Sequence, residues 1–571
     1  MSVLLKKSRP ALFLLCVFVL CGLLNGKRAD AAAYPPLKDK STGIVVSSHI
    51  LANAIGKDVL DKGGNAVDAA VAVGYALSVV HPAAGNIGGG GFGIILTADG
   101  KTTACDFREK APLAATRDMY LDKDGSVVPG LSTLGYKAAG VPGTVAGMSA
   151  MLEKFGTKTL PELIAPAITL AEEGYVINAR QELSLAEFAG DLAKFASSRK
   201  YFLKPDGSSY KEGDLFVQKD LAETLKQIAA SGPDAFYKGK VGQMLAEDMK
   251  NNGGLITMDD LAKYQVAWRE PAKGTYRGYE IVSMSPPSSG GTHIVQMLNI
   301  MEHADIGAMG FASSQTIHLM AEAMRYAFAD RSEYMGDPDF VNVPAEKLAS
   351  KEYAKRIYDK IKANRGKATP SSDVRPGMAL HEGANTTHYS VVDKWGNAVA
   401  VTYTINESYG SAAAIMGLGF LLNNEMDDFA AKAGVPNIYG LVGNDANCIA
   451  PEKRPLSSMS PSIVLKDGKL FMVAGSPGGS RIITTTLQVI SNVIDHGMDI
   501  SEAVMAPRIH MQWLPDELRV EKYGLSKDVE KALEAMGYTI QVKAPMGDVN
   551  AILVDQETGV MYGTGDPRAE F

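Results

Sequence analysis

The chain has 571 residues and a formal net charge of −7, and 46% of its residues are hydrophobic and 21% charged. This is the composition of an ordinary globular protein, and it excludes a largely disordered chain. The length is too great for one ordinary core, so we expect either two domains or one large sandwich. An acidic chain without a basic run binds nucleic acid poorly, and we exclude nucleic acid as a partner.

The N-terminus has the pattern of a secretory signal peptide. Lys6, Lys7 and Arg9 precede the apolar run ALFLLCVFVLCGLL, and ADAAAY then offers small residues spaced A-x-A. The alternative is a membrane anchor, but the apolar run is short for a membrane span. We therefore expect cleavage after Ala31, which removes residues 1–31 and leaves a secreted or periplasmic protein without a membrane segment.

The first half of the remaining chain begins with a strand, two helices and a hairpin. Residues 43–80 fit a strand followed by two helices, and Asn65 is placed to cap the second helix. The glycine run 88–91 then leads into two strands joined by Asp99-Gly100, which is a favourable hairpin turn.

The later elements are mostly helices followed by hairpins. From about 140 to 380 the apolar spacing is mostly helical, but 353–384 becomes rich in Pro, Gly and Ser, and we expect an exposed connection there. Two hairpins are predicted around Gly396 and Gly468, and helices return after 481. Sheets with helices on both sides predict a layered α/β sandwich.

Several common functional motifs are absent from the sequence. The glycine run 88–91 lacks the Gly-Lys-Ser/Thr ending and the G-x-G-x-x-G spacing of nucleotide sites, so a tight structural turn is the better interpretation. The histidines are scattered, and neither H-E-x-x-H nor C-x-x-C occurs, so a metal site has little support. The sequence also lacks the G-x-S-x-G elbow that is typical of serine hydrolases. Cys105 and Cys448 follow the proposed signal peptide, and the sequence leaves open whether they pair.

Two adjacent threonines, Thr386 and Thr387, stand where the exposed connection meets a predicted strand. A threonine hydroxyl is a poor nucleophile unless a base lies within hydrogen-bonding reach. Cleavage of the chain before a threonine supplies that base as its own α-amine, whose usual pKa of about 7.7–8.0 suits general-base catalysis near neutrality. Only one of the two can serve, because neighbouring strand residues point to opposite faces.

Long motifs through the chain carry a resemblance to a known family. In chain order they are GGNAVDAAVA, NIGGGGFGI, DFREKAP, NTTHYSVVDKWGNAVAVTYTIN, LLNNEMDDF, GLVGNDAN, KRPLSSMSPSIV and GSPGGSRIITT. The sequence closely resembles the γ-glutamyltranspeptidases, which are N-terminal nucleophile hydrolases, over essentially everything after the signal peptide. The resemblance implies an α+β fold, a four-layer αββα sandwich that a large and a small subunit form jointly.

The resemblance implies how the chain matures. The first threonine of TTHYS is the family's nucleophile, which here is Thr386. Autoproteolysis between Asn385 and Thr386 would give a large subunit, 32–385, and a small subunit, 386–571. Thr404 matches a family threonine that hydrogen-bonds near the nucleophile and assists maturation.

The resemblance also assigns residues to the two charged groups of a γ-glutamyl head, its α-carboxylate and its α-ammonium. Arg108 matches the arginine that holds the α-carboxylate, for which a planar bidentate donor is suited. Glu425 stands where family members carry Gln or Glu, and we expect the difference to alter affinity more than activity. The two oxyanion-hole glycines have a physical basis as well, since free amides at a helix start can face an anion. The full set is hydroxyl donors Ser457 and Ser458, ammonium partners Asp428, Glu425 and Asn406, oxyanion glycines Gly478 and Gly479, and the lid residue Tyr439.

The implied reaction is a two-step acyl transfer. Thr386 would take the acyl group from glutathione or another γ-glutamyl compound and pass it to water, an amino acid or a dipeptide, without a cofactor because one residue supplies both nucleophile and base. Alternatives of the same fold are a cephalosporin (glutaryl) acylase and a poly-γ-glutamate depolymerase; Arg108 and the paired serines favour a free γ-glutamyl group. An alternative of another class is an exported protein that binds glutathione or glutamate without turnover and keeps one intact chain.

Overall fold

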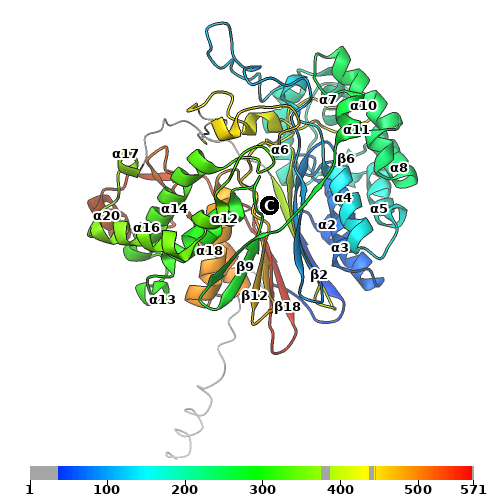
Figure 1. The fold of residues 1–571 in the computed structure, drawn as a ribbon. Coiled ribbons are helices and arrows are strands. Elements are labelled where there is room, and N and C mark those ends of the chain that lie inside the picture. The colour runs from blue at the N-terminus through cyan, green and yellow to red at the C-terminus, as the bar shows by residue number, and fades with distance from the viewer. Residues whose placement is uncertain are drawn as a thin grey trace, which may run out of the picture. The chain divides into compact units, whose positions relative to one another are not determined.

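Two antiparallel sheets lie at the centre of the part of the chain that the computed structural model describes, residues 36–374, 386–435, 437, 441, 443 and 445–568 (Figure 1). In strand order, the six-stranded sheet contains β2 (Gly43–Ser47), β10 (Thr387–Asp393), β11 (Ala398–Thr404), β3 (Gly90–Leu96), β4 (Thr102–Phe107) and β7 (Ala267–Arg269). The seven-stranded sheet contains β1 (Leu37–Asp39), β18 (Met561–Gly565), β17 (Asn550–Val554), β13 (Lys469–Ala474), β12 (Ser462–Lys466), β9 (Tyr279–Ser283) and β8 (Ala272–Tyr276).

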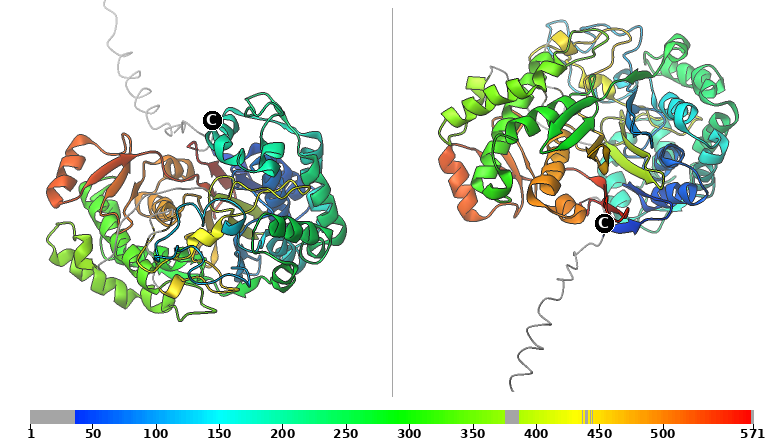
Figure 2. Two further views of the ribbon diagram at one scale, coloured as in Figure 1. Left: turned by 90° about the horizontal axis from the view of Figure 1, so that it is seen from above. Right: turned by 60° about the horizontal axis from the view of Figure 1, so that its bottom comes forward.

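Helices cover the outer face of each sheet, as the two further views in Figure 2 also show. On the six-stranded sheet they are α2 (Ile50–Asp61), α3 (Ala66–Val80), α4 (Thr144–Phe155), α5 (Leu160–Glu173), α6 (Ala179–Leu192), α7 (Ala196–Phe202), α8 (Lys219–Ser231), α9 (Pro233–Tyr237), α10 (Lys240–Asn251) and α11 (Met258–Lys263). On the other side are α12 (Gly290–Met301), α13 (Ile306–Met309), α14 (Ser314–Tyr334), α15 (Ala345–Leu348), α16 (Lys351–Ala363), α17 (Ser371–Val374), α18 (Arg481–His496), α19 (Ile500–Met505) and α20 (Lys527–Met536).

Smaller elements complete the described chain. They are a three-stranded sheet of β14 (Ile509–His510), β15 (Leu518–Glu521) and β16 (Ile540–Lys543), a two-stranded sheet of β5 (Tyr175–Val176) and β6 (Leu215–Phe216), and the 3₁₀ turns η1 (Tyr136–Ala138), η2 (Glu425–Asp428) and η3 (Asp445–Asn447).

Side-chain alternation in the sheets explains the four layers. In β10, Tyr389 and Val391 pack into the core under α3 and α4, whereas Val392 packs into a separate core between the two sheets. That inter-sheet core takes side chains from both sheets, among them Val46 and Ile94 from the six-stranded sheet and Ile463 and Val473 from the seven-stranded sheet. Strands β10 and β11 bury both faces and all their residues are buried, as expected for the middle of a sheet covered on both sides. The expected four-layer αββα sandwich is confirmed.

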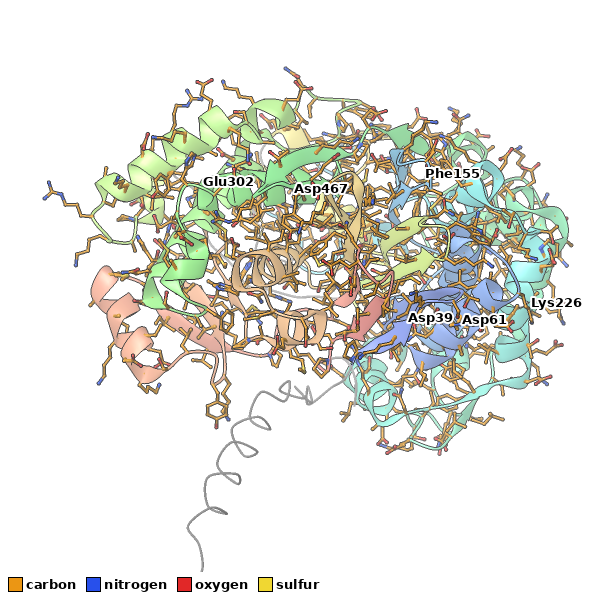
Figure 3. All side chains as sticks on the ribbon, turned by 90° about the horizontal axis from the view of Figure 1, so that it is seen from below. Asp39, Asp61, Phe155, Lys226, Glu302 and Asp467 are labelled. Atoms are coloured by element: carbon orange, nitrogen blue, oxygen red, sulfur yellow. The ribbon has the colours of Figure 1, made fainter. Side chains whose placement is uncertain are left out.

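The predicted caps and turns are present. The Asn65 side chain accepts hydrogen bonds from the backbone of Val67 and Asp68 and caps α3. The hairpins β3–β4, β10–β11 and β12–β13 form at the three predicted turns. In the last of these, Asp467 (labelled in Figure 3) and Gly468 both have positive φ, 52° and 72°, which an Asp-Gly pair adopts readily.

The glycine run 88–91 allows the backbone to pack closely beside β11. A Cβ at Gly89 would lie 2.0 Å from the carbonyl oxygen of Thr404, and a Cβ at Gly88 would lie 2.1 Å from that of Leu421. No side chain fits at either position. The run therefore has a structural reason, but that reason is close backbone approach rather than a tight turn, and its last two glycines begin β3.

The boundary of the expected exposed connection is wrong. Helix α16 continues through Ala363, whereas the sequence analysis ended helical structure near 353. Ala354, Ile357 and Ile361 are spaced on one face of this helix and are buried against its neighbours. The many charged residues between them obscured a narrow apolar stripe.

Several expectations concern the chain ends and the cysteines. Across the described residues, no helix is long and apolar enough to cross a membrane. Residues 1–31, with the cleavage position at Ala31, lie outside the described residues, so export stays a prediction. Cys105 and Cys448 are both buried, and no disulfide joins them in the structure.

Candidate active site

The expected site residues come together around one cavity of about 290 Å³, next to the start of β10 and the end of β11. Gly478 neighbours a lining residue, whereas Tyr439 and Asn385 lie outside the described residues. The described lining consists of Arg108, Arg331, Thr386, Thr404, Asn406, Glu425, Asp428, Leu441, Ser457, Ser458, Met459, Gly479 and Ile482.

Thr386, rather than Thr387, has its side chain in the cavity. It directly precedes β10 and is 7% exposed, and its hydroxyl donates to Thr404 Oγ1 over 3.4 Å. The Thr404 oxygen also accepts from the backbone N–H of Asn406 at 2.8 Å, which fixes its position. Thr387 is fully buried and its hydroxyl lies 3.0 Å from Ser48 Oγ instead. The alternation of side chains along the strand thus separates the two threonines, and the sequence alone could not show which of them faces the cavity.

No side chain in the described lining is an obvious base for Thr386. The lining contains neither histidine nor lysine. His388 lies two residues further along β10, but its ring nitrogens contact the hydroxyls of Thr402 and Ser390 at 2.8 and 3.0 Å. Burial lowers the pKa of His388 to about 3, so this histidine is neutral. An α-amine created at Thr386 would be a base already in place.

Arg108 lies at the centre of a buried cluster of acids. Its Nη1 is 2.7 Å from Glu425 Oε2, its Nη2 donates to Asp428, and its Nε donates to the carbonyl of Pro455 at 3.3 Å. Glu109 adds a third carboxyl at 3.6 Å. The resemblance assigned Arg108 and the acids to different charged groups of one substrate head, whereas here they also bind one another.

The acids in this cluster titrate abnormally. Burial raises the pKa of Glu109 to about 8 and that of Glu425 well above its usual range, even though Arg108 opposes both shifts. A protonated Glu425 can donate to Asp428. Burial also raises the pKa of Asp428, but two cations, Arg108 and Arg331, act against that shift. Burial therefore favours the protonated form of both glutamates, whereas Asp428 is opposed in this by two cations.

The two serines are held in an extended segment against the loop before α12. Ser457 donates its N–H to Pro287 and accepts through its carbonyl from Ser289 N–H, at 2.9 and 2.8 Å. Its hydroxyl oxygen accepts from the N–H of Met459 at 3.1 Å. Both serines are nearly buried, at 2% and 7% exposed, and both line the cavity. These contacts fix Ser457 on the cavity wall.

Gly478 and Gly479 directly precede Ser480, the N-cap of α18. Their φ values are 134° and 57°, in the region that favours glycine. Among the described residues, neither N–H donates to a recorded acceptor, whereas both carbonyls accept from the first turn of α18. Free amides at a helix N-terminus, one of them on the cavity wall, can hold a developing negative charge.

Arg331 is a lining residue that the sequence analysis missed. It lies in the last turn of α14, within the motif ADRSEY, and is 4% exposed. In the sequence it looks like one more charge on a helix, and only the fold brings it to the cavity. An arginine at the end of an otherwise apolar helical face was the available signal.

The acids of the cavity are committed to arginine rather than arranged for a metal. In the described part of the chain, no group of three or more His, Cys, Asp or Glu side chains is placed to hold a metal ion. The donor set instead consists of two guanidiniums, hydroxyls and two carboxyls, which complements a small zwitterion.

Comparisons with known proteins agree with this geometry. The gamma-glutamyltranspeptidase family model matches residues 52–570. The glutathione hydrolase proenzyme of Escherichia coli is 52% identical, over 96% of this chain and 97% of that protein. The solved gamma-glutamyltranspeptidase of Helicobacter pylori is 60% identical, with a TM-score of 0.59 over 61% of this chain and 100% of that chain. The solved cephalosporin acylase of Bacillus halodurans is 27% identical, with a TM-score of 0.82 over 94% of this chain and 97% of that chain. This chain belongs to the gamma-glutamyltranspeptidase family.

Proposed function

We propose that this protein is a γ-glutamyl acyltransferase and glutathione hydrolase that matures by autoproteolysis between Asn385 and Thr386. The observation that carries the proposal is one cavity that combines a threonine hydroxyl with the donors and acceptors for an amino-acid head group. Thr386 and Arg108 line that cavity together with Asp428. Family membership and the name of the E. coli relative, glutathione hydrolase proenzyme, support the same activity.

Maturation begins in the intact chain. Thr386 Oγ1 attacks the carbonyl carbon of Asn385, the peptide C–N bond breaks, and water hydrolyses the resulting ester. The Thr404 hydroxyl, 3.4 Å from Thr386 Oγ1, holds the attacking oxygen in place. The products are a large subunit, 32–385, and a small subunit, 386–571, which stay together because β10 and β11 lie inside a sheet built from both.

The solved Helicobacter pylori chain supports this division. It matches 61% of this chain over its whole length, which is close to the share that a large subunit ending at 385 would have.

The mature site then catalyses acyl transfer. Thr386 Oγ1 bonds to the γ-carbonyl carbon of the substrate while its own α-amine takes the hydroxyl proton. The amides of Gly478 and Gly479 donate to the oxyanion. The C–N bond of the substrate breaks, and the α-ammonium returns the proton to the leaving amine. Water or an acceptor amine attacks the ester, which releases glutamate or a new γ-glutamyl amide and restores the Thr386 hydroxyl.

Substrate recognition uses the charged wall of the cavity. The α-carboxylate binds Arg108 and the hydroxyls of Ser457 and Ser458, and the α-ammonium binds Asp428 with Glu425 and Asn406. The two charged groups are bonded to the same α-carbon, so each meets its opposite charge at that end of the γ-glutamyl group while the γ-carbonyl at the other end faces Thr386. Glutathione and other γ-glutamyl compounds are the substrates, and amino acids or dipeptides are the acceptors.

Export completes the proposal. The N-terminal signal directs the chain out of the cytoplasm, and cleavage after Ala31 releases the precursor as a secreted or periplasmic protein. Activity on external γ-glutamyl compounds follows from that location.

Turnover of γ-glutamyl p-nitroanilide by the purified protein tests the function. The parent protein releases p-nitroaniline and migrates as two bands on a denaturing gel, whereas Thr386→Ala gives one band and no release. Thr387→Ala is the matched control, because that side chain lies outside the cavity, and it retains both properties. Faster turnover of glutaryl-cephalosporin than of γ-glutamyl amides would support the acylase instead, and an uncut inactive parent would support the binding protein.

A further inference from the structure

Arg331 connects the serine wall of the cavity to the loop before α12. Its Nε donates to Ser289 Oγ at 2.9 Å, and its Nη2 donates to Ser458 Oγ at 3.2 Å. Ser289 Oγ in turn donates to the carbonyl of Ser457 at 2.8 Å. One buried guanidinium thus fixes both members of the serine pair, one through its hydroxyl and the other through its backbone.

The chemistry of the guanidinium sets the direction of these hydrogen bonds. Arginine has five N–H donors and no acceptor, so Ser458 Oγ must accept from Arg331. Because the Ser458 oxygen accepts from Arg331, its own O–H remains available to donate to a ligand in the cavity. Ser457 is in the same state, because its oxygen accepts from the N–H of Met459. Both serines are therefore prepared as donors, and a donor pair suits an anion rather than a cation.

The charge of Arg331 works in the same direction. Arg108 is engaged by Glu425 and Asp428 before any substrate arrives. Burial lowers the pKa of Arg331 only to about 10, so it stays positive at neutral pH. Arg331 therefore supplies a second cation on the cavity wall besides Arg108, which the acids already engage.

We propose that Arg331 is a positioning residue for substrate carboxylate recognition: it holds Ser458 as a hydrogen-bond donor and supplies the second positive charge at that end of the cavity. This inference rests on the proposed γ-glutamyl transfer. It predicts that the loss of Arg331 weakens recognition of the carboxylate much more than recognition of the ammonium, because Arg108 still contacts Asp428.

Three acyl anilides separate recognition of the α-carboxylate from recognition of the α-ammonium. The γ-glutamyl anilide carries both charged groups, the glutaryl anilide lacks the ammonium, and the 4-aminobutyryl anilide lacks the carboxylate. KM and kcat are measured for each with the mature protein, and inhibition constants replace KM where turnover is slow. Active-site titration corrects kcat for the fraction of processed protein.

Arg331→Met is expected to raise KM about 10- to 100-fold for the γ-glutamyl and glutaryl compounds, the range for losing a hydrogen bond to a charged group. KM for the 4-aminobutyryl compound changes less than about 2-fold, because that compound makes no carboxylate contact. Arg331→Lys keeps the charge but not the planar fork, and it restores part of the loss. Arg325→Met is the matched control: Arg325 lies on the same helix, is equally buried and is absent from the cavity lining, so selectivity is unchanged.

Equal effects on all three compounds, or unchanged KM values in processed Arg331→Met protein, would overturn the inference. If Arg331→Met does not accumulate, the Arg331→Lys variant decides: a selective rise in KM for the two carboxylate compounds supports the inference, and unchanged selectivity refutes it. A parent protein that fails to release p-nitroaniline from the γ-glutamyl compound would refute the proposed function itself, so the two failures are distinguishable.

Discussion

Replacing Arg108 with Met removes the cation at the centre of the acid cluster and leaves Asp428 short of a partner. Removing one member of a buried ion pair typically costs about 3–5 kcal/mol of unfolding free energy. We expect a value near the lower end, about 3 kcal/mol at pH 8, because Arg331 still acts on Asp428. The Nε hydrogen bond to Pro455 is lost in the same step.

The cost depends on pH with a definite sign. Burial already holds the pKa of Asp428 and of Glu425 above their usual values, and loss of Arg108 raises both further. A group with a raised folded-state pKa contributes stability that is complete below its unfolded pKa and is lost as pH rises through the folded pKa. The difference between parent and variant is therefore small near pH 4 and grows toward pH 8.

Urea unfolding at pH 4, 6 and 8 measures this difference. Both proteins carry Thr386→Ala, so that processing does not change between them. Arg117→Met is the control, since Arg117 and its partner Asp445 are both exposed and such pairs contribute about 0–1 kcal/mol. A cost for Arg108→Met that is equal at pH 4 and pH 8, or that matches the control, would refute the charge assignment of the cluster.

Three further outcomes follow from the site. Thr404→Val leaves the Asn406 N–H without its acceptor and removes the hydroxyl beside Thr386, so precursor cleavage on a gel time course slows about 10-fold or more; an unchanged rate would exclude the assisting role. Gly479→Ala places a side chain at φ 57° on the cavity wall, and kcat for the γ-glutamyl anilide falls about 100-fold if its amide serves the oxyanion; a change in KM alone would contradict that. Reducing and non-reducing gels give identical patterns because no disulfide joins Cys105 to Cys448, and a shift to one cross-linked band would contradict the structure.

The sequence predicted those parts of the fold that depend on local chemistry. Asn65 caps a helix, and Asp467 and Gly468 form a tight turn, because in each case neighbouring residues decide the conformation. The predicted end of helical structure near residue 353 was wrong, because α16 continues to Ala363. Its three buried apolar residues stand among many charged ones, and this apolar period is too weak to recognise without the surface that the helix packs against.

The site was predictable as a set of residues but not as an arrangement. Motifs named Arg108 and Asp428, yet no spacing in the sequence shows that the two bind each other across 320 residues. The choice of Thr386 over Thr387 required the structure, which shows which of these two neighbouring side chains enters the cavity. Arg331 was missed altogether, because its partners are brought to it by tertiary packing.

N-terminal sequencing of the smaller fragment, combined with a γ-glutamyl anilide assay on the same sample, tests the central claim most directly. The account predicts an active sample whose small fragment begins Thr-Thr-His-Tyr-Ser, with Thr386 as its first residue. An active protein whose backbone is continuous through that position, or whose fragment begins at any other residue, would contradict it.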